Sequence, residues 1–189
     1  MAPTIRSGRV ALTPVELREA ADLWKLVRTP PAIEHFPDPR TGPDGLTRWL
    51  GEALAAGTYV WTVRRRHVPV GLLTAELRSP SIAVVGYSID ERWIDDSVAG
   101  DALGALVDWL FEARSVHRVE LRVATGSLAL WRVAQQAGFC LEGVARESWR
   151  WAGAWHDARD YALLRREWLT RKRPARPTQP VAMHVVPAG

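Results

Sequence analysis

The sequence predicts a mixed α/β domain in which a mostly antiparallel sheet is flanked by helices. Residues 97–139 read as helix, strand and helix, because apolar residues recur every three or four positions on both sides of a short alternating segment. Three apolar, alternating segments with short links precede this unit, and two extended runs joined by a turn follow it. A strand between two helices, with further strands before and after it, indicates a mixed sheet.

The N-terminal third combines helices with one short strand. Residues 10–13 form the strand, which Pro14 closes, and residues 15–27 have the apolar spacing of a helix. Residues 29–43 are rich in proline, so we expect a loop there, and its position suggests a cover over a substrate site. A second helix over residues 46–55 ends before Gly57.

The middle of the chain supplies most of the predicted sheet. Strands over residues 59–65, 68–77 and 82–89 are connected so tightly that they form an antiparallel meander. A helix from residue 99, a strand over 117–123 and a helix over 127–137 follow, the last ended by Gly138.

Residues 140–151 and 155–168 are predicted to form a terminal hairpin with its turn at 152–154. We therefore expect one domain over residues 1–169 and a disordered, basic, proline-rich tail over 170–189. The single cysteine, Cys140, stands at a strand start, where a buried and inert thiol is expected.

The composition excludes several classes of protein. The 189 residues are 47% hydrophobic and 24% charged, as in an ordinary globular domain. The net charge of +4 equals the four basic residues of the tail after residue 170, so the domain is neutral and no nucleic-acid partner is expected. Without a long apolar run or a leader pattern, we expect a cytoplasmic protein that has no membrane partner. No cluster has metal-ligand spacing, so no metal is expected.

Five segments in a fixed order resemble the GNAT superfamily of acyl-CoA-dependent N-acyltransferases, in particular its RimJ/RimL-like branch. They are VALTPVELREAADLWKLV, VGYSID, HRVELRV, RVAQQAGFCLEGVARE and WHDARDYALLRREW, spanning residues 10–168. The resemblance implies a GNAT-like fold, acetyl-CoA as co-substrate, and a small-molecule amine or a protein N-terminus as acceptor. It also implies a possible homodimer through the last strand pair, where Trp149, Trp151, Trp155 and Trp168 lie.

The resemblance also assigns the donor site. Backbone groups of Tyr87, Ser88 and Ile89, where two strands separate, would pair with the pantetheine arm. The pyrophosphate would lie at the start of the following helix, at Ser97, Val98, Ala99 and Gly100, and Ser127 stands where the family has asparagine.

The pyrophosphate loop departs from the family pattern (Gln/Arg)-x-x-Gly-x-(Gly/Ala). Aligned over residues 94–99, it has Ile94 in place of the basic or amide residue and Ser97 in place of glycine, while Asp95 and Asp96 add negative charge. A serine of the family becomes Leu130. Asp95 or Ser97 could instead cap the helix.

Two carboxylates are candidate catalytic bases, Glu120 on the central strand and Glu91 just past the predicted separation of the strands. The alternatives are an ion pair of Glu120 with Arg118 or Arg122 and a solvated loop position for Glu91. His156 and Asp157 are adjacent on a strand and point to opposite faces, so they fit a hairpin-stabilising role better than a dyad. Two functions follow, an N-acyltransferase and a GNAT-fold binding or regulatory module that has lost acetyl-CoA binding.

Overall fold

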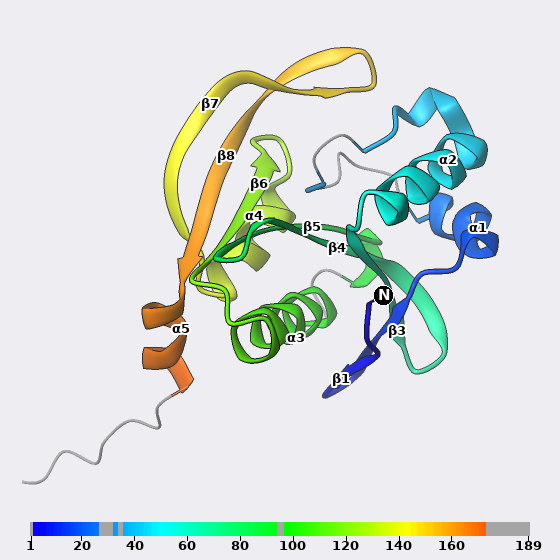
Figure 1. Cartoon of the computed structure of the whole chain (residues 1–189). Coiled ribbons are helices and arrows are strands. Elements are labelled where there is room, and N and C mark those ends of the chain that lie inside the picture. The colour runs from blue at the N-terminus through cyan, green and yellow to red at the C-terminus, as the bar shows by residue number, and fades with distance from the viewer. Residues whose placement is uncertain (1, 27–31, 34–35, 94–96, 173–189) are drawn as a thin grey trace, which may run out of the picture.

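A single twisted sheet runs through the molecule (Figure 1). The computed structural model describes residues 2–26, 32–33, 36–93 and 97–172. Eight strands lie in the order β1-β2-β3-β4-β5-β6-β8-β7. Their bounds are β1 Ile5–Ser7, β2 Val10–Pro14, β3 Tyr59–Arg65, β4 Val68–Ser79, β5 Ile82–Ile89, β6 Arg118–Ala124, β7 Cys140–Trp151 and β8 Ala154–Leu164.

The pairing confirms the predicted mixed sheet. β5 and β6 run parallel, and every other neighbouring pair of the described sheet is antiparallel. The crossover between β5 and β6 contains helix α3, as its position in the sequence requires. Strand β1 has no counterpart in the sequence prediction, since three residues are too short for a periodic signal.

Helices cover both faces of the sheet. The α-helices are α1 Ala20–Trp24, α2 Gly42–Ala55, α3 Val98–Ala113, α4 Leu128–Gln136 and α5 Arg165–Lys172, and the 3-10 helices are η1 Leu17–Glu19, η2 Pro39–Thr41 and η3 Glu91–Trp93. The predicted first helix is divided between η1 and α1 and ends earlier than expected within the described residues. Among the described residues, no helix is long and apolar enough to cross a membrane.

The larger core lies between the sheet and α3. Leu103, Leu106 and Leu110 of α3 are fully buried against inward-facing residues of β3 to β6, including Trp61 and Leu121. The apolar spacing that predicted α3 is the spacing that this core requires. A second core on the other face joins α1 and α2 to the hairpin of β7 and β8. In Figure 1 this hairpin rises from the sheet and its tip arches toward α2.

The last predicted strand was wrong beyond Leu164, because α5 begins at Arg165. Trp168 stacks on Phe111 at a ring-centroid distance of 5.2 Å, and its indole N–H donates to Asp108 at 2.6 Å. These contacts fix α5 against α3, and the helix continues past residue 169, where the domain boundary was expected. Residues 173–189 of the expected tail lie outside the described residues.

The expectation of a buried Cys140 was also wrong, because this side chain is exposed. β7 is the edge strand of the sheet, and most of its first half faces solvent. Its neighbour Leu141 is 50% exposed. An edge strand with little covering it leaves even small apolar side chains in contact with water.

Candidate functional site

The sheet opens between β5 and β6. Their parallel pairing joins residues 82–85 to 118–121 and ends there, although β5 continues to Ile89 and β6 to Ala124. Each strand stays paired on its other side, β5 with β4 and β6 with β8. Beyond Val85, at the start of VGYSID, the two strands no longer pair with each other, and we call the region between their facing edges the slot. The separation expected at the end of VGYSID was therefore placed too late in the sequence.

A short segment of the chain occupies part of this slot. The N–H of Ala32 donates to the Tyr87 carbonyl at 2.8 Å, and the N–H of Tyr87 donates to the Ala32 carbonyl at 2.9 Å. Gly86 permits this approach, because a Cβ there would lie 2.7 Å from the Ala32 carbonyl oxygen. Both backbone groups of Tyr87, expected to pair with the pantetheine arm, are therefore engaged within the chain.

The other two expected backbone positions face opposite ways. Backbone groups alternate sides along a strand, so the residue after Tyr87 faces β4. Ser88 is accordingly paired opposite Leu72, and the N–H of Asp90 donates to the Val70 carbonyl at 2.9 Å. Ile89 is the next residue after Tyr87 whose backbone faces the slot.

Ser97 has the left-handed backbone that favours glycine. It directly precedes α3 and has a φ of 59° and a ψ of −4°. Its carbonyl accepts the N–H of Asp101 at 2.8 Å. Its side chain makes no capping hydrogen bond, so the expectation that Ser97 caps α3 through its hydroxyl was wrong. Residue 97 is where the family pattern has glycine, so the serine retains the backbone shape of that position.

The first turn of α3 follows directly. Val98 and Ala99 are buried, whereas Gly100 is half-buried and a Cβ there would meet nothing within 4 Å. The N–H groups of these first helical residues have no partner within the helix and can hold an anion. Ile94, Asp95 and Asp96 lie outside the described residues.

The start of α4 forms the opposite side of the slot. Ser127 precedes α4, is largely buried, and makes no capping hydrogen bond with its side chain. The Tyr87 hydroxyl donates to the Leu130 carbonyl, which ties β5 to α4. Burial raises the pKa of Tyr87 far above its ordinary value, so this phenol is a structural donor and stays protonated. Leu130 itself is buried in the larger core.

The two predicted bases have different surroundings. Glu120 forms an ion pair with Arg118, from Nε to Oε1 at 2.7 Å, and a second with Arg78 at 3.6 Å. Arg118 in turn holds Glu142, and this hydrogen bond lowers the pKa of Glu142. Glu120 therefore belongs to an ion-pair network, and an ion pair was the alternative to a catalytic base that the sequence left open. Glu91 lies exposed in η3, beyond the end of β5.

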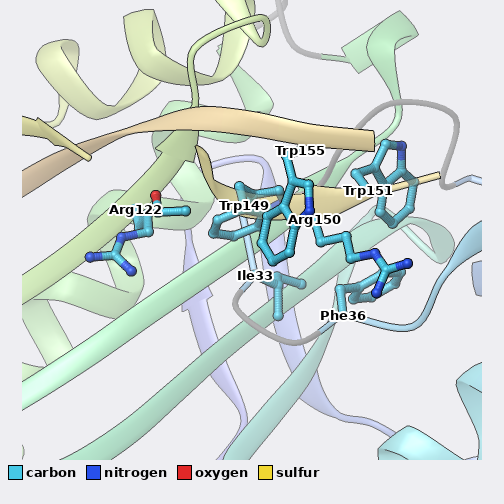
Figure 2. A pocket seen from close by; sticks show the side chains of 8 residues that line it. Ile33, Phe36, Arg122, Trp149, Arg150, Trp151 and Trp155 are labelled. Atoms are coloured by element: carbon cyan, nitrogen blue, oxygen red, sulfur yellow. The ribbon is translucent and has the colours of Figure 1, made fainter. Parts of the chain in front are cut away.

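An aromatic pocket of about 330 Å³ lies beside the slot under the hairpin (Figure 2). It is lined by Ile33, Phe36, Arg122, Ser148, Trp149, Arg150, Trp151 and Trp155. The sequence analysis connected these tryptophans with a possible homodimer and not with a ligand. The spacing of Trp149 and Trp151 could have signalled a shared strand face, but nothing in the sequence brings residues 33 and 36 to the hairpin.

Arg40 of η2 lies close to the tip of the hairpin. Asp38 accepts two hydrogen bonds from the Arg40 guanidinium, at 2.9 and 2.8 Å, and these hold the pKa of Asp38 down at about 2. The same guanidinium lies beside the turn, 3.8 Å or less from a Cβ built on Gly153. Asp157 of β8 accepts the N–H of Glu147 at 2.9 Å, in line with the expected hairpin-stabilising role.

Among the described residues, no group of three or more histidine, cysteine, aspartate or glutamate side chains is placed to hold a metal ion.

Residues 9–140 match the family model described as an acetyltransferase (GNAT) domain. The chain belongs to the GNAT acetyltransferase family. Members of this family transfer acyl groups from acyl-CoA.

Individual proteins of known sequence or structure are also similar to this chain. YjcK of Bacillus subtilis (strain 168), a probable N-acetyltransferase, is 33% identical over 82 residues, which cover 43% of this chain and 45% of YjcK. The match thus spans under half of that relative. Mycobacterium smegmatis RimJ, solved with CoA-disulfide, superposes with a TM-score of 0.71 at 22% identity, covering 86% of each chain. The RimL ribosomal L7/L12 α-N-protein acetyltransferase, solved with coenzyme A, gives 0.73 at 17% identity, covering 86% of this chain and 98% of RimL. The likeness to these two structures concerns the fold.

Proposed function

We propose that this GNAT domain transfers an acyl group, acetyl in the simplest case, from acyl-CoA to a primary amine. The observation that carries the proposal is the left-handed backbone of Ser97 at the start of α3. A non-glycine residue in this conformation is strained, and such strain persists where the surrounding structure requires it. Here it aims the first turn of α3 at the position where the family binds the pyrophosphate.

The reaction needs little covalent help from the protein. The amine nitrogen attacks the thioester carbonyl carbon and the C–N bond forms, and the C–S bond then breaks to release coenzyme A as a thiolate, which takes up a proton from water. In this proposal the slot-facing N–H of Ile89, together with that of Tyr87 once Ala32 withdraws, polarises the thioester carbonyl. The proton lost by the amine passes to a base, directly or through water.

Glu91 and Glu120 remain the proposed bases, and their surroundings distinguish them. Glu120 must give up part of its contact with Arg118 or Arg78 before it can accept a proton. Glu91 is exposed at the exit of β5 and reaches the slot through water in this proposal. Glu91→Gln and Glu120→Gln therefore form a matched pair, and the variant whose kcat falls while acetyl-CoA affinity is unchanged identifies the base.

The donor proposal is tested by calorimetric titration with acetyl-CoA and with free coenzyme A. Ser97→Gly relieves the backbone strain and is expected to tighten binding, whereas Ser97→Val aggravates it and should weaken binding. Ser115→Gly is the control, because Ser115 has φ 53° beyond the other end of α3. Micromolar binding together with coenzyme A release in the presence of amines supports the proposal. A folded protein that gives no heat at millimolar acetyl-CoA overturns it.

A second function, a binding module without catalysis, is favoured by one observation. Ala32 takes both backbone groups of Tyr87, the residue at the centre of the slot. In that case acetyl-CoA would not displace Ala32, and the titration would show no binding in wild type or Ser97→Gly.

The homodimer stays a proposal with less support than the sequence gave it. Trp149 and Trp151 are buried under the hairpin and Trp168 is packed on α3, so three of the four tryptophans that suggested it are used within the chain. Trp155 is 60% exposed. Sedimentation of the protein at several concentrations tests this proposal.

A further inference from the structure

We infer from the aromatic pocket that the acceptor is a small primary amine with an aromatic body and an anionic group. The inference rests on the proposed acyl transfer and narrows its substrate class. It concerns the pocket of about 330 Å³ under the hairpin, whose lining combines four aromatic rings with a guanidinium at its edge.

The aromatic pocket adjoins the slot on two sides. Arg122, in its lining, is the first β6 residue beyond the pairing with β5, so the pocket begins where the strands separate. Ile33, also in its lining, directly follows Ala32, which bridges to Tyr87 inside the slot. An amine at the inner end of the pocket would therefore lie beside the position proposed for the thioester.

The walls of the pocket suit a flat apolar body. Phe36, Trp149 and Trp151 are 8% exposed or less, with the Phe36 and Trp151 ring centroids 6.2 Å apart, while Trp155 closes the outer side. Buried rings gain from stacking against a further ring. A volume of about 330 Å³ is at the small end for ligand pockets, which favours a one-ring or two-ring amine over a large polycation.

Charge selects further among such amines. No carboxylate lines the aromatic pocket among the described residues. Figure 2 shows the Arg122 guanidinium turned away from the rings, where it is paired with Asp160 at 2.5 Å, whereas Arg150 extends across toward Phe36. The nearby Asp38 is already held by Arg40. Arg150 lies over the Trp155 ring, with its Cζ 5.8 Å from the ring centroid, and no ion pair of its guanidinium is found among the lining residues. In this inference Arg150 attracts an anionic group and repels a second ammonium.

A neighbouring groove offers the opposite chemistry. It lies between α2 and strands β4 and β5, has a volume of about 330 Å³, and includes the carboxylates of Glu52 and Glu76 in its lining. A polyamine would be attracted there. The charge preference of the acceptor therefore distinguishes the two cavities.

Three benzylamines that differ only in their para group provide the test. 4-(Aminomethyl)benzoate carries an anion, benzylamine carries hydrogen, and 4-(aminomethyl)benzylamine carries a second cation. Their dissociation constants are measured by calorimetry with coenzyme A present, and their kcat/KM values by coenzyme A release from acetyl-CoA. We expect the benzoate to bind about tenfold more tightly than benzylamine, as one charge-assisted hydrogen bond allows, and the diamine to bind most weakly.

Two variants locate the effect. Arg150→Gln should reduce the preference for the benzoate to less than about threefold, since it removes the charge and keeps the stem. Arg146→Gln is the matched control, because Arg146 is exposed on the same strand and is not in the lining. Trp155→Ala should weaken the binding of all three probes, and the variant loses little packing because this side chain is 60% exposed.

The outcomes separate the acceptor class from the acyl transfer. Binding in the expected order without any coenzyme A release upholds the aromatic, anionic ligand class and overturns the transferase. Release that is fastest with the diamine, or an order that Arg150→Gln leaves unchanged, upholds the transferase and overturns this inference. A diamine preference lost in Glu76→Gln would place the acceptor in the neighbouring groove.

Discussion

The two faces of the sheet are assembled in different ways. The α3 face draws its core from periodic elements, with α3, α4 and alternating strands each contributing a regular apolar side. The other face joins two helices to a hairpin and to a short segment at residues 32–36, with Phe36, Trp149 and Trp151 between them. The α3 face is therefore built from regular apolar periodicity, whereas the hairpin face contains the aromatic pocket that we propose selects the acceptor.

The largest expected effect is on the α3 face. Leu106→Ala removes a side chain that is fully buried in the larger core, and should lower the free energy of unfolding by about 2–5 kcal/mol. Leu54→Ala, at a position 41% exposed on α2, should change it by less than about 0.5 kcal/mol. Urea denaturation followed by circular dichroism measures both. Equal effects would contradict the placement of Leu106 in the buried core and of Leu54 at the surface.

The second-largest effect is expected on the hairpin face, from Gly86→Ala. The added Cβ would lie 2.7 Å from the Ala32 carbonyl oxygen and 2.9 Å from Ile33 Cγ1, so the segment has to move. We expect a loss of about 1–3 kcal/mol in unfolding free energy and weaker binding of the benzylamine probes. Gly51→Ala, where a Cβ meets nothing within 4 Å, is the control. Unchanged probe affinity in Gly86→Ala would show that the bridge does not shape the pocket.

Gly104→Ala should act in the opposite direction. Gly104 lies inside α3, and a Cβ there meets nothing within 4 Å. Alanine has the higher helix propensity, so the variant should be more stable by about 0.5–1 kcal/mol. Thermal unfolding measures the gain, which should leave the affinity for acetyl-CoA unchanged. A lower melting temperature would indicate that α3 needs this glycine for a contact outside the described residues.

The smallest effect concerns acid and the hairpin tip. The pKa of Asp38 in the folded protein is about 2, below its ordinary value of 3.8. Its contribution to stability is therefore complete above pH 3.8 and is lost as the pH falls through about 2. Asp38→Asn should reduce the change in the melting temperature of the protein between pH 3.8 and about pH 2. A parallel pH profile in the variant and the wild type would contradict this assignment.

The fold could be predicted where periodicity is local. The strand at 82–89 and the helix that starts near residue 99 follow from alternation and from apolar spacing within a few residues. The Ala32–Tyr87 bridge could not be predicted, because it joins a proline-rich segment to a strand 55 positions later and leaves no repeating pattern. α5 was missed because Trp168 and Arg165 look like strand residues until α3 lies beside them.

The residues of the candidate site could also be predicted only in part. The resemblance placed the donor residues along β5 and the start of α3, since backbone positions follow from register. It could not assign Glu120 to an ion pair with Arg78, which comes from β4. The aromatic pocket was also missed, because its walls come from three separate stretches of the chain.

The bridge from Ala32 to Tyr87 has a consequence for thermodynamic linkage. Ala32 lies in the slot proposed for acyl-CoA, and the adjacent Ile33 lines both the aromatic pocket and the neighbouring groove. If acyl-CoA takes the backbone groups of Tyr87, it must displace the residue that positions Ile33. Donor and acceptor affinities then share one coupling factor, and each ligand changes the dissociation constant of the other by the same ratio.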